Sequence, residues 1–133
     1  MVQYHGPERR SFTRLPISLQ VDFLLFDTQD SKELTDRMGA HARNISAGGL
    51  LIETSRIPVE WMNALISGKI TFVLEFKIPG SENPIRTSAR VSWMARRKEE
   101  EAVEPFVMGL NFTEITPEDQ ERIIQFVSNA PQK

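Results

Sequence analysis

Hydrophobic residues recur at every second position in several segments of the chain, a pattern typical of half-buried β-strands. The first segment starts at Ser18, and its apolar positions are Leu19, Val21, Phe23 and Leu25. The same period of two recurs over residues 70–78, 85–93 and 106–112. Residues 50–54 have the composition of another short strand, and residues 34–43 show a weaker pattern. The sequence therefore predicts about six short strands.

Polar segments separate the predicted strands. Gly, Pro, Asn, Asp and Ser concentrate in three of them, over residues 27–32, 44–49 and 79–84, and predict turns. Residues 96–104 carry mixed charges and favour a solvated hairpin loop. A short helix is predicted over residues 58–66, with Gly68 just beyond its end. In that helix Trp61 and Leu65 share a face, and Trp61 is expected to belong to the core.

The C-terminal segment predicts a longer helix. Thr116 suits the N-cap, Pro117 the first helical position and Asp119 the acid of a capping box. The apolar positions that follow fall on one face, at Ile123, Phe126, Val127 and Ala130. Short strands joined by turns, followed by one helix, predict an all-β fold, a small antiparallel β-barrel with a C-terminal α-helix. Closing the barrel would remove exposed strand edges.

Residues 1–16 lack both hydrophobic periods and contain Gly6, Pro7 and Pro16. We expect a flexible N-terminal arm there and a barrel domain over residues 17–133. The N-terminus has no apolar stretch typical of a secretory signal, and the longest apolar run is residues 23–26. These features predict a cytoplasmic protein that does not insert into a membrane.

Composition limits the classes of function. The 133 residues are 40% hydrophobic and 26% charged, with a formal net charge of −2 and no cysteine. The chain is long enough for one domain with a core. Its acidic balance disfavours a general nucleic-acid binder, and the lack of cysteine excludes disulfides and thiolate metal sites.

The sequence offers little support for catalysis or metal binding. Its two histidines, His5 and His41, have no partner at ligand spacing. Ser46 does not lie in a nucleophile elbow, and no phosphate-binding loop or dinucleotide fingerprint occurs. We expect no enzyme, no metal and no resident cofactor. A barrel hydrolase that uses His41 as a base is the lowest-ranked alternative.

Arginines cluster in the arm, at Arg9, Arg10 and Arg14. The ordinary interpretation of such a cluster is a solvated basic tail. The grouping has a second interpretation, because guanidinium binds phosphate in a bidentate fork, stacks on purines and donates to guanine O6 and N7.

A polar segment about thirty residues later runs from Asn44 to Gly49. An ordinary turn explains it, because Asn, Ser and Gly are turn residues. Alternatively, the Asn44 amide contacts a base edge, the Ser46 hydroxyl donates or accepts, and Gly49 lets backbone approach a ligand. Together the two motifs favour a pocket for a multiply charged anion that carries a base.

The two motifs, Arg-x-x-x-Arg at residues 10–14 and Asn-x-Ser-x-x-Gly at residues 44–49, resemble the signature of PilZ domains, bacterial receptors for cyclic di-GMP. The resemblance covers roughly residues 8–130, including Val91-Ser92-Trp93 and Gly109-Leu110-Asn111-Phe112. It implies a six-stranded antiparallel barrel with a C-terminal helix, in agreement with the hydrophobic pattern. It also implies a receptor without catalytic activity.

By this resemblance, Arg10 and Arg14, helped by Arg9, bind phosphate and guanine. Asn44 and Ser46 contact guanine and the phosphodiester, and Gly49 keeps the turn open. Arg9, which precedes the first motif arginine, resembles family members that take two intercalated cyclic di-GMP molecules.

Trp93 is a further candidate for base contact, and a barrel-interior tryptophan is an equal alternative. Some family members use an arginine two residues after such a tryptophan. This chain has Ala95 there, so the roles of Arg96 and Arg97 stay open.

The resulting hypothesis is a cyclic di-GMP receptor whose N-terminal arm folds over bound ligand and whose changed surface is recognised by another protein. Two alternatives stay open. One is a PilZ-like protein-interaction adaptor that does not bind the ligand. The other is a small β-barrel that binds single-stranded nucleic acid, which the acidic balance disfavours.

Overall fold

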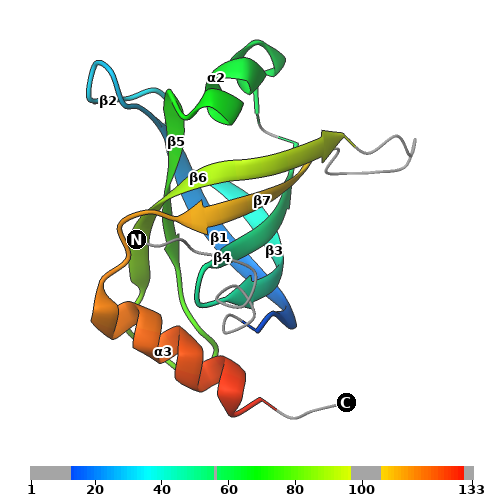
Figure 1. Cartoon of the computed structure of the whole chain (residues 1–133), viewed down its shortest axis with the longest axis vertical. Coiled ribbons are helices and arrows are strands. Elements are labelled where there is room, and N and C mark those ends of the chain that lie inside the picture. The colour runs from blue at the N-terminus through cyan, green and yellow to red at the C-terminus, as the bar shows by residue number, and fades with distance from the viewer. Residues whose placement is uncertain (1–12, 56, 97–105, 131–133) are drawn as a thin grey trace, which may run out of the picture.

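Six strands close into an antiparallel barrel, and a seventh, two-residue strand lies beside it (Figure 1). The computed structural model describes residues 13–55, 57–96 and 106–130. In chain order the strands are β1 (Leu15–Asp27), β2 (Lys32–Glu33), β3 (Met38–Ser46), β4 (Gly49–Thr54), β5 (Ile70–Phe76), β6 (Ile85–Arg96) and β7 (Phe106–Phe112). They pair in the order β2-β1-β3-β4-β7-β6-β5, and β1 also pairs with β5. This second pairing of β1 closes the barrel and confirms the predicted fold class.

Strand β1 joins both sides of the barrel, pairing with β3 along its first part and with β5 along its second. Its inward positions form the centre of the core, where Val21, Phe23 and Leu25 are 0–1% exposed. The Phe23 and Phe72 rings lie 5.0 Å apart between centroids. The strand begins at Leu15 and not at Ser18 as the alternation indicated. Residues 15 and 16, assigned to the arm from their composition, therefore belong to a barrel strand.

The helices lie at opposite ends of the barrel (Figure 1). At one end, the 3-10 helix η1 (Val59–Trp61) leads into α2 (Met62–Ser67), and Gly68, with a φ of 86°, ends it. The predicted short helix is thus confirmed. Leu65 is fully buried, and Trp61, which is half-buried, packs against the core as expected.

Helix α3 (Pro117–Ser128) covers the other end of the barrel. The predicted N-cap is confirmed, because the Thr116 hydroxyl accepts a hydrogen bond of 3.1 Å from the Asp119 backbone N–H. Ile123 and Val127 are buried against the core. The Asp119 carboxylate, predicted to be the acid of a capping box, pairs with Arg122 at 2.8 Å instead.

Arg122 also fixes α3 to the connection between β5 and β6. Its guanidinium donates to the Ser81 hydroxyl at 2.7 Å and to the Asn83 carbonyl at 2.6 Å. This contact joins segments that are 41 residues apart in the chain.

The segment from Asn44 to Gly49 is not the loop that its composition predicted. Strand β3 continues to Ser46, β4 starts at Gly49, and the turn between them consists of Ala47 and Gly48. Pairing of β3 with β1 and of β4 with β7 holds these polar residues in strands. The predicted loop at residues 96–104 lies almost wholly outside the described residues, as does most of the arm. No helix within the described part of the chain has the length and apolar character to cross a membrane.

Candidate ligand-binding site

Outward-facing residues of neighbouring strands form two rows across the barrel wall. Residues directly opposite each other in antiparallel strands project from the same face of the sheet. Leu15, the first residue of β1, lies opposite Ile45 of β3. Arg14, one residue before the strand, therefore lies at the level of Ser46. The first row therefore consists of Arg14, Ser46, Gly49 and Asn111. The second row consists of Pro16, Asn44, Leu51, Gly109 and Trp93.

An irregularity at Arg43 turns Asn44 toward the outside. The register of β3 on β4 shifts between Ala42 and Asn44, so that Arg43 is an extra residue on β3. Ala42 and Ile45 are both fully buried although they are three residues apart. Strict alternation from Ala42 would have placed Asn44 in the core. A β-bulge that re-aims a side chain in this way is common beside functional sites.

A second irregularity, at Ser92, turns Trp93 toward the outside. Val91 is buried, and the register of β6 on β7 shifts between Val91 and Trp93. The Ser92 hydroxyl donates to the Gly109 carbonyl at 3.1 Å. Trp93 is 43% exposed on the outer face. The interpretation of Trp93 as a barrel-interior residue is therefore wrong.

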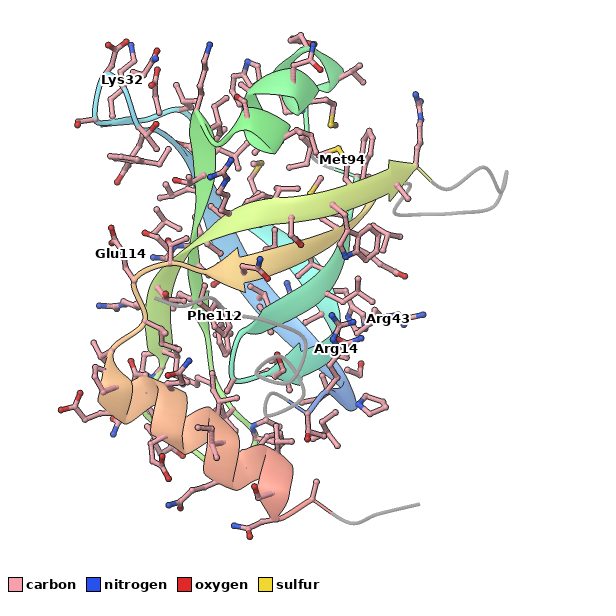
Figure 2. The ribbon with its side chains drawn as sticks, viewed as in Figure 1. Arg14, Lys32, Arg43, Met94, Phe112 and Glu114 are labelled. Carbon is pink, nitrogen blue, oxygen red and sulfur yellow. The ribbon has the colours of Figure 1, made fainter. Side chains whose placement is uncertain are left out.

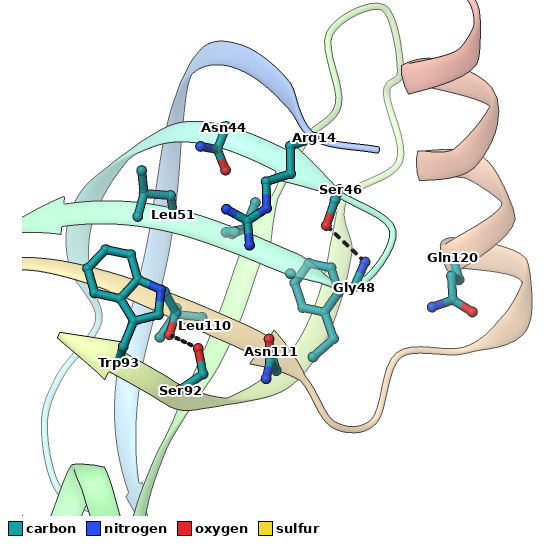
Figure 3. A pocket seen from close by; sticks show the side chains of 14 residues that line it. Arg14, Asn44, Ser46, Gly48, Leu51, Ser92, Trp93, Leu110, Asn111 and Gln120 are labelled. Carbon is teal, nitrogen blue, oxygen red and sulfur yellow. Dashed lines mark hydrogen bonds between the residues drawn. The ribbon is translucent and has the colours of Figure 1, made fainter. Parts of the chain in front are cut away.

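A pocket of about 560 Å³ lies over the two rows (Figure 3). It brings together five of the residues predicted from the motifs and from β6, namely Arg14, Asn44, Ser46, Gly49 and Trp93. Arg9 and Arg10 lie outside the described residues. Figure 2 shows Arg14 and Arg43 on the same side of the barrel, where β1 runs beside β3. The end of the arm is thus fixed beside the second motif.

Two glycines form the floor of the pocket. A Cβ atom on Gly49 would overlap the carbonyl group of Leu110 on β7, and one on Gly109 would overlap the Trp93 indole. Glycine at residue 49 is therefore required by the close approach of β7, in addition to any approach of a ligand. The lack of side chains at these two residues lets β7 approach β4 at Gly49 and lets the Trp93 indole lie against β7 at Gly109.

Amide and hydroxyl groups supply most of the polar atoms around the pocket. Ser46 is 8% exposed, and its Oγ accepts a hydrogen bond of 3.1 Å from the Gly48 N–H, so that the hydroxyl proton remains available. Among the described lining residues Arg14 is the only charged one, and none is Asp or Glu. A lining with one guanidinium, several neutral donors and no carboxylate suits an anion that also carries polar edges.

The sequence interpretation missed three polar lining residues, Ser92, Asn111 and Gln120. Asn111 was visible as a polar position in the alternating strand at residues 106–112, but only the pairing of β7 with β4 shows which residues it faces. Gln120 comes from α3, and its side-chain amide donates to the Ala47 carbonyl at 2.9 Å. That contact spans 73 residues of sequence.

The structure assigns Arg96 a local partner. Its guanidinium lies 5.7 Å from the centroid of the Phe106 ring, in a cation–π contact across β6 and β7. Arg97 lies outside the described residues. Within the described ranges, no cluster of three or more His, Asp or Glu side chains could hold a metal ion.

Solved structures of low sequence identity share this fold. The inhibitor of motility MotI (DgrA) of Bacillus subtilis matches with a TM-score of 0.65 and 21% identity, over 96% of this chain and 51% of that one. The PilZ domain of YcgR from Escherichia coli, solved with c-di-GMP, matches with a TM-score of 0.57 and 13% identity, over 90% and 89%. MrkH, described as a c-di-GMP-dependent transcription regulatory factor, matches with a TM-score of 0.56 and 15% identity, over 89% and 49%.

This chain spans about half the length of MotI and of MrkH. A comparison with curated protein sequences finds no match. The model of the PilZ domain family matches residues 8–129, which include both motifs and every described strand and helix. The chain therefore belongs to the PilZ domain family.

Proposed function

We propose that this chain is a non-enzymatic receptor for cyclic di-GMP. The observation that carries the proposal is the register that sets Arg14, just before β1, beside Asn44 and Ser46 at the end of β3. A guanidinium beside a hydroxyl and an amide matches a ligand that has phosphates and guanine edges. Membership of the PilZ family and the c-di-GMP in the solved PilZ domain of YcgR support the same ligand.

In this proposal Arg10 and Arg14 bind phosphate and guanine, and Asn44, Ser46 and Trp93 complete the contacts on the barrel. Binding orders the N-terminal arm over the pocket, because the ligand gives its arginines a partner. A downstream protein then recognises the rearranged surface. Hydrogen exchange of residues 1–16 with and without cyclic di-GMP tests the arm. Equal exchange in both states would contradict its ordering.

Calorimetric titration with cyclic di-GMP tests the receptor function directly. Hydrogen bonds to a charged group contribute about 1.5–3 kcal/mol each. Arg14→Ala should therefore weaken binding roughly 10- to 100-fold. Arg86→Ala is the matched control, since Arg86 is exposed and pairs with Glu75 on another part of the barrel. A wild-type chain that shows neither heat nor a thermal shift with cyclic di-GMP would overturn the proposal and favour an adaptor that acts through protein contacts alone.

We further propose that two intercalated cyclic di-GMP molecules bind per chain. The support is Arg9, which precedes the Arg-x-x-x-Arg motif, together with the charge of the ligands. Two ligands carry four negative charges, and a third guanidinium offsets more of this charge than two can. The same titration gives the stoichiometry. A value near one ligand per chain for the wild type would rule out the paired mode.

A further inference from the structure

Asn111 is a pocket residue that neither motif includes. It lies on β7 directly opposite Gly49 of β4 and points outward, because its neighbour Leu110 is 2% exposed and points into the core. It is exposed at the edge of the pocket (Figure 3). The Asn111 side chain therefore takes no part in packing of the core.

Only a glycine separates Asn111 from Ser46 of the Asn-x-Ser-x-x-Gly motif along the first row. Gly49 lies between Ser46 and Asn111 in the first row. In the neighbouring second row, Leu51 and Gly109 occupy the corresponding positions of β4 and β7. Adjacent strands are about 4.8 Å apart, so Ser46 and Asn111 stand roughly 10 Å from each other across the glycine. This spacing leaves room for a ligand group between the two side chains.

Asn44 and Asn111 thus flank β4 from opposite sides, on β3 and β7. Neither side-chain amide is hydrogen-bonded to another residue in the described part of the chain, whereas the Ser92 hydroxyl and the Gln120 amide are both bound to backbone carbonyls. An asparagine amide offers one acceptor oxygen and two N–H donors, which match the edge of a purine. Two such amides match a ligand that presents two purine edges.

We propose that Asn111 contacts a purine edge of the bound cyclic dinucleotide, as the counterpart of Asn44 across β4. This inference rests on the proposed function and extends it to a residue outside the motifs. Guanine presents N1–H and N2–H donors beside the O6 acceptor, and adenine presents an N6 amino donor beside the N1 acceptor. An amide can pair with either edge, so Asn111 contributes affinity for both bases.

Titrations of Asn111→Ala and Asn111→Asp with cyclic di-GMP and with a cyclic guanine–adenine dinucleotide test this assignment. Loss of one base-edge contact in Asn111→Ala should weaken binding of cyclic di-GMP roughly 5- to 100-fold. Asn111→Asp supplies only acceptors, so it should increase the preference for the guanine-only ligand, even if the added charge weakens binding of both.

Asn63→Ala, an exposed change on α2 at the other end of the barrel, is the matched control. Circular dichroism and thermal unfolding verify that each variant folds. If the wild type binds cyclic di-GMP and Asn111→Ala binds it equally well, the assignment of Asn111 fails while the receptor function stands. If Asn111→Asp weakens both ligands by the same factor, Asn111 contacts phosphate or ribose and the base contact is overturned. A wild type that binds neither ligand removes both proposals.

Discussion

The indole of Trp93 occupies the space above Gly109 into which any side chain at residue 109 would project. The two residues face each other across β6 and β7. Gly109 therefore sets the position of the aromatic ring at the edge of the pocket, although it offers no side chain to a ligand.

Gly109→Ala should displace Trp93 while leaving the barrel folded. The new Cβ overlaps an indole that is 43% exposed and can move into solvent, so the loss of stability should be about 1 kcal/mol. The chain has two tryptophans, so a Trp61→Phe background leaves Trp93 as the sole indole fluorophore. If the indole moves, the fluorescence emission maximum of Trp93 should differ between the Trp61→Phe protein and the Trp61→Phe, Gly109→Ala double variant. An unchanged spectrum would contradict the contact.

Gly49→Ala should be far more harmful than Gly109→Ala. The Cβ at residue 49 overlaps the backbone carbonyl of Leu110, which is held in the pairing of β4 with β7 and cannot rotate away. We expect a loss of roughly 3 kcal/mol or more, measured by urea unfolding. A loss as small as that of Gly109→Ala would show that β4 and β7 separate easily.

The sequence predicted the strands but not the two β-bulges, at Arg43 and Ser92, that turn the Asn44 and Trp93 side chains outward. Alternation along β6 carries the inward face from Ile85 to Val91 and would continue to Trp93, and the extra residue Ser92 reverses that direction. The same holds for Arg43 and Asn44 on β3. A bulge is a relation between two strands, so a local pattern of apolar residues does not contain it.

The prediction of a loop at the second motif, made from local composition, was also wrong. Asn44 and Ser46 have turn-forming side chains, yet pairing with β1 and β4 holds them in a strand. Such tertiary pairing overrides weak local propensity. The N-cap of α3 was predictable because Thr116 and Pro117 act within one turn, whereas the contact of Gln120 with Ala47 joins distant segments.

The stability of the barrel should decline in acid partly through Glu75. The hydrogen bond and charge of Arg86, together with the charge of Arg37, lower the pKa of this carboxyl below its ordinary value of 4.5. A carboxyl whose pKa is lowered on folding stabilises the protein above its unfolded value, and this contribution disappears as pH falls through the folded value.

The difference in unfolding free energy between wild type and Glu75→Gln should therefore be largest near neutral pH and shrink below pH 4.5. Urea unfolding at about pH 7 and about pH 3 measures it. Glu82→Gln, in the connection between β5 and β6, serves as the comparison. A difference for Glu75→Gln that stays constant over this range would exclude the ion pairs as its source.

Arg122→Ala should loosen the attachment of α3 to the barrel. The variant loses hydrogen bonds to Asp119, Ser81 and Asn83, and charged hydrogen bonds of this kind contribute about 1.5–3 kcal/mol in favourable cases. Because the Arg122 side chain is 30% exposed, we expect a total loss of about 1–2 kcal/mol. Urea unfolding measures it, and Arg122→Lys, which keeps the charge but not the fork, should fall between wild type and alanine. An Arg122→Ala variant with the same unfolding free energy as wild type would show that packing of the buried Ile123 and Val127 alone holds the helix on the barrel.

Arg14→Lys separates the charge of the pocket from its geometry. Lysine keeps the positive charge but lacks the planar fork that binds phosphate or guanine with two hydrogen bonds. If Arg14 acts as proposed, the affinity for cyclic di-GMP should fall in the order wild type, Arg14→Lys, Arg14→Ala.

Raising the salt from about 0.1 M to about 1 M shortens the screening length from about 10 Å to about 3 Å. This change should weaken ligand binding by wild type and by Arg14→Lys more than binding by Arg14→Ala. Calorimetry at both salt concentrations measures this. Equal affinity of Arg14→Lys and wild type would show that Arg14 contributes charge alone, and equal salt dependence of all three would place its guanidinium away from the phosphates.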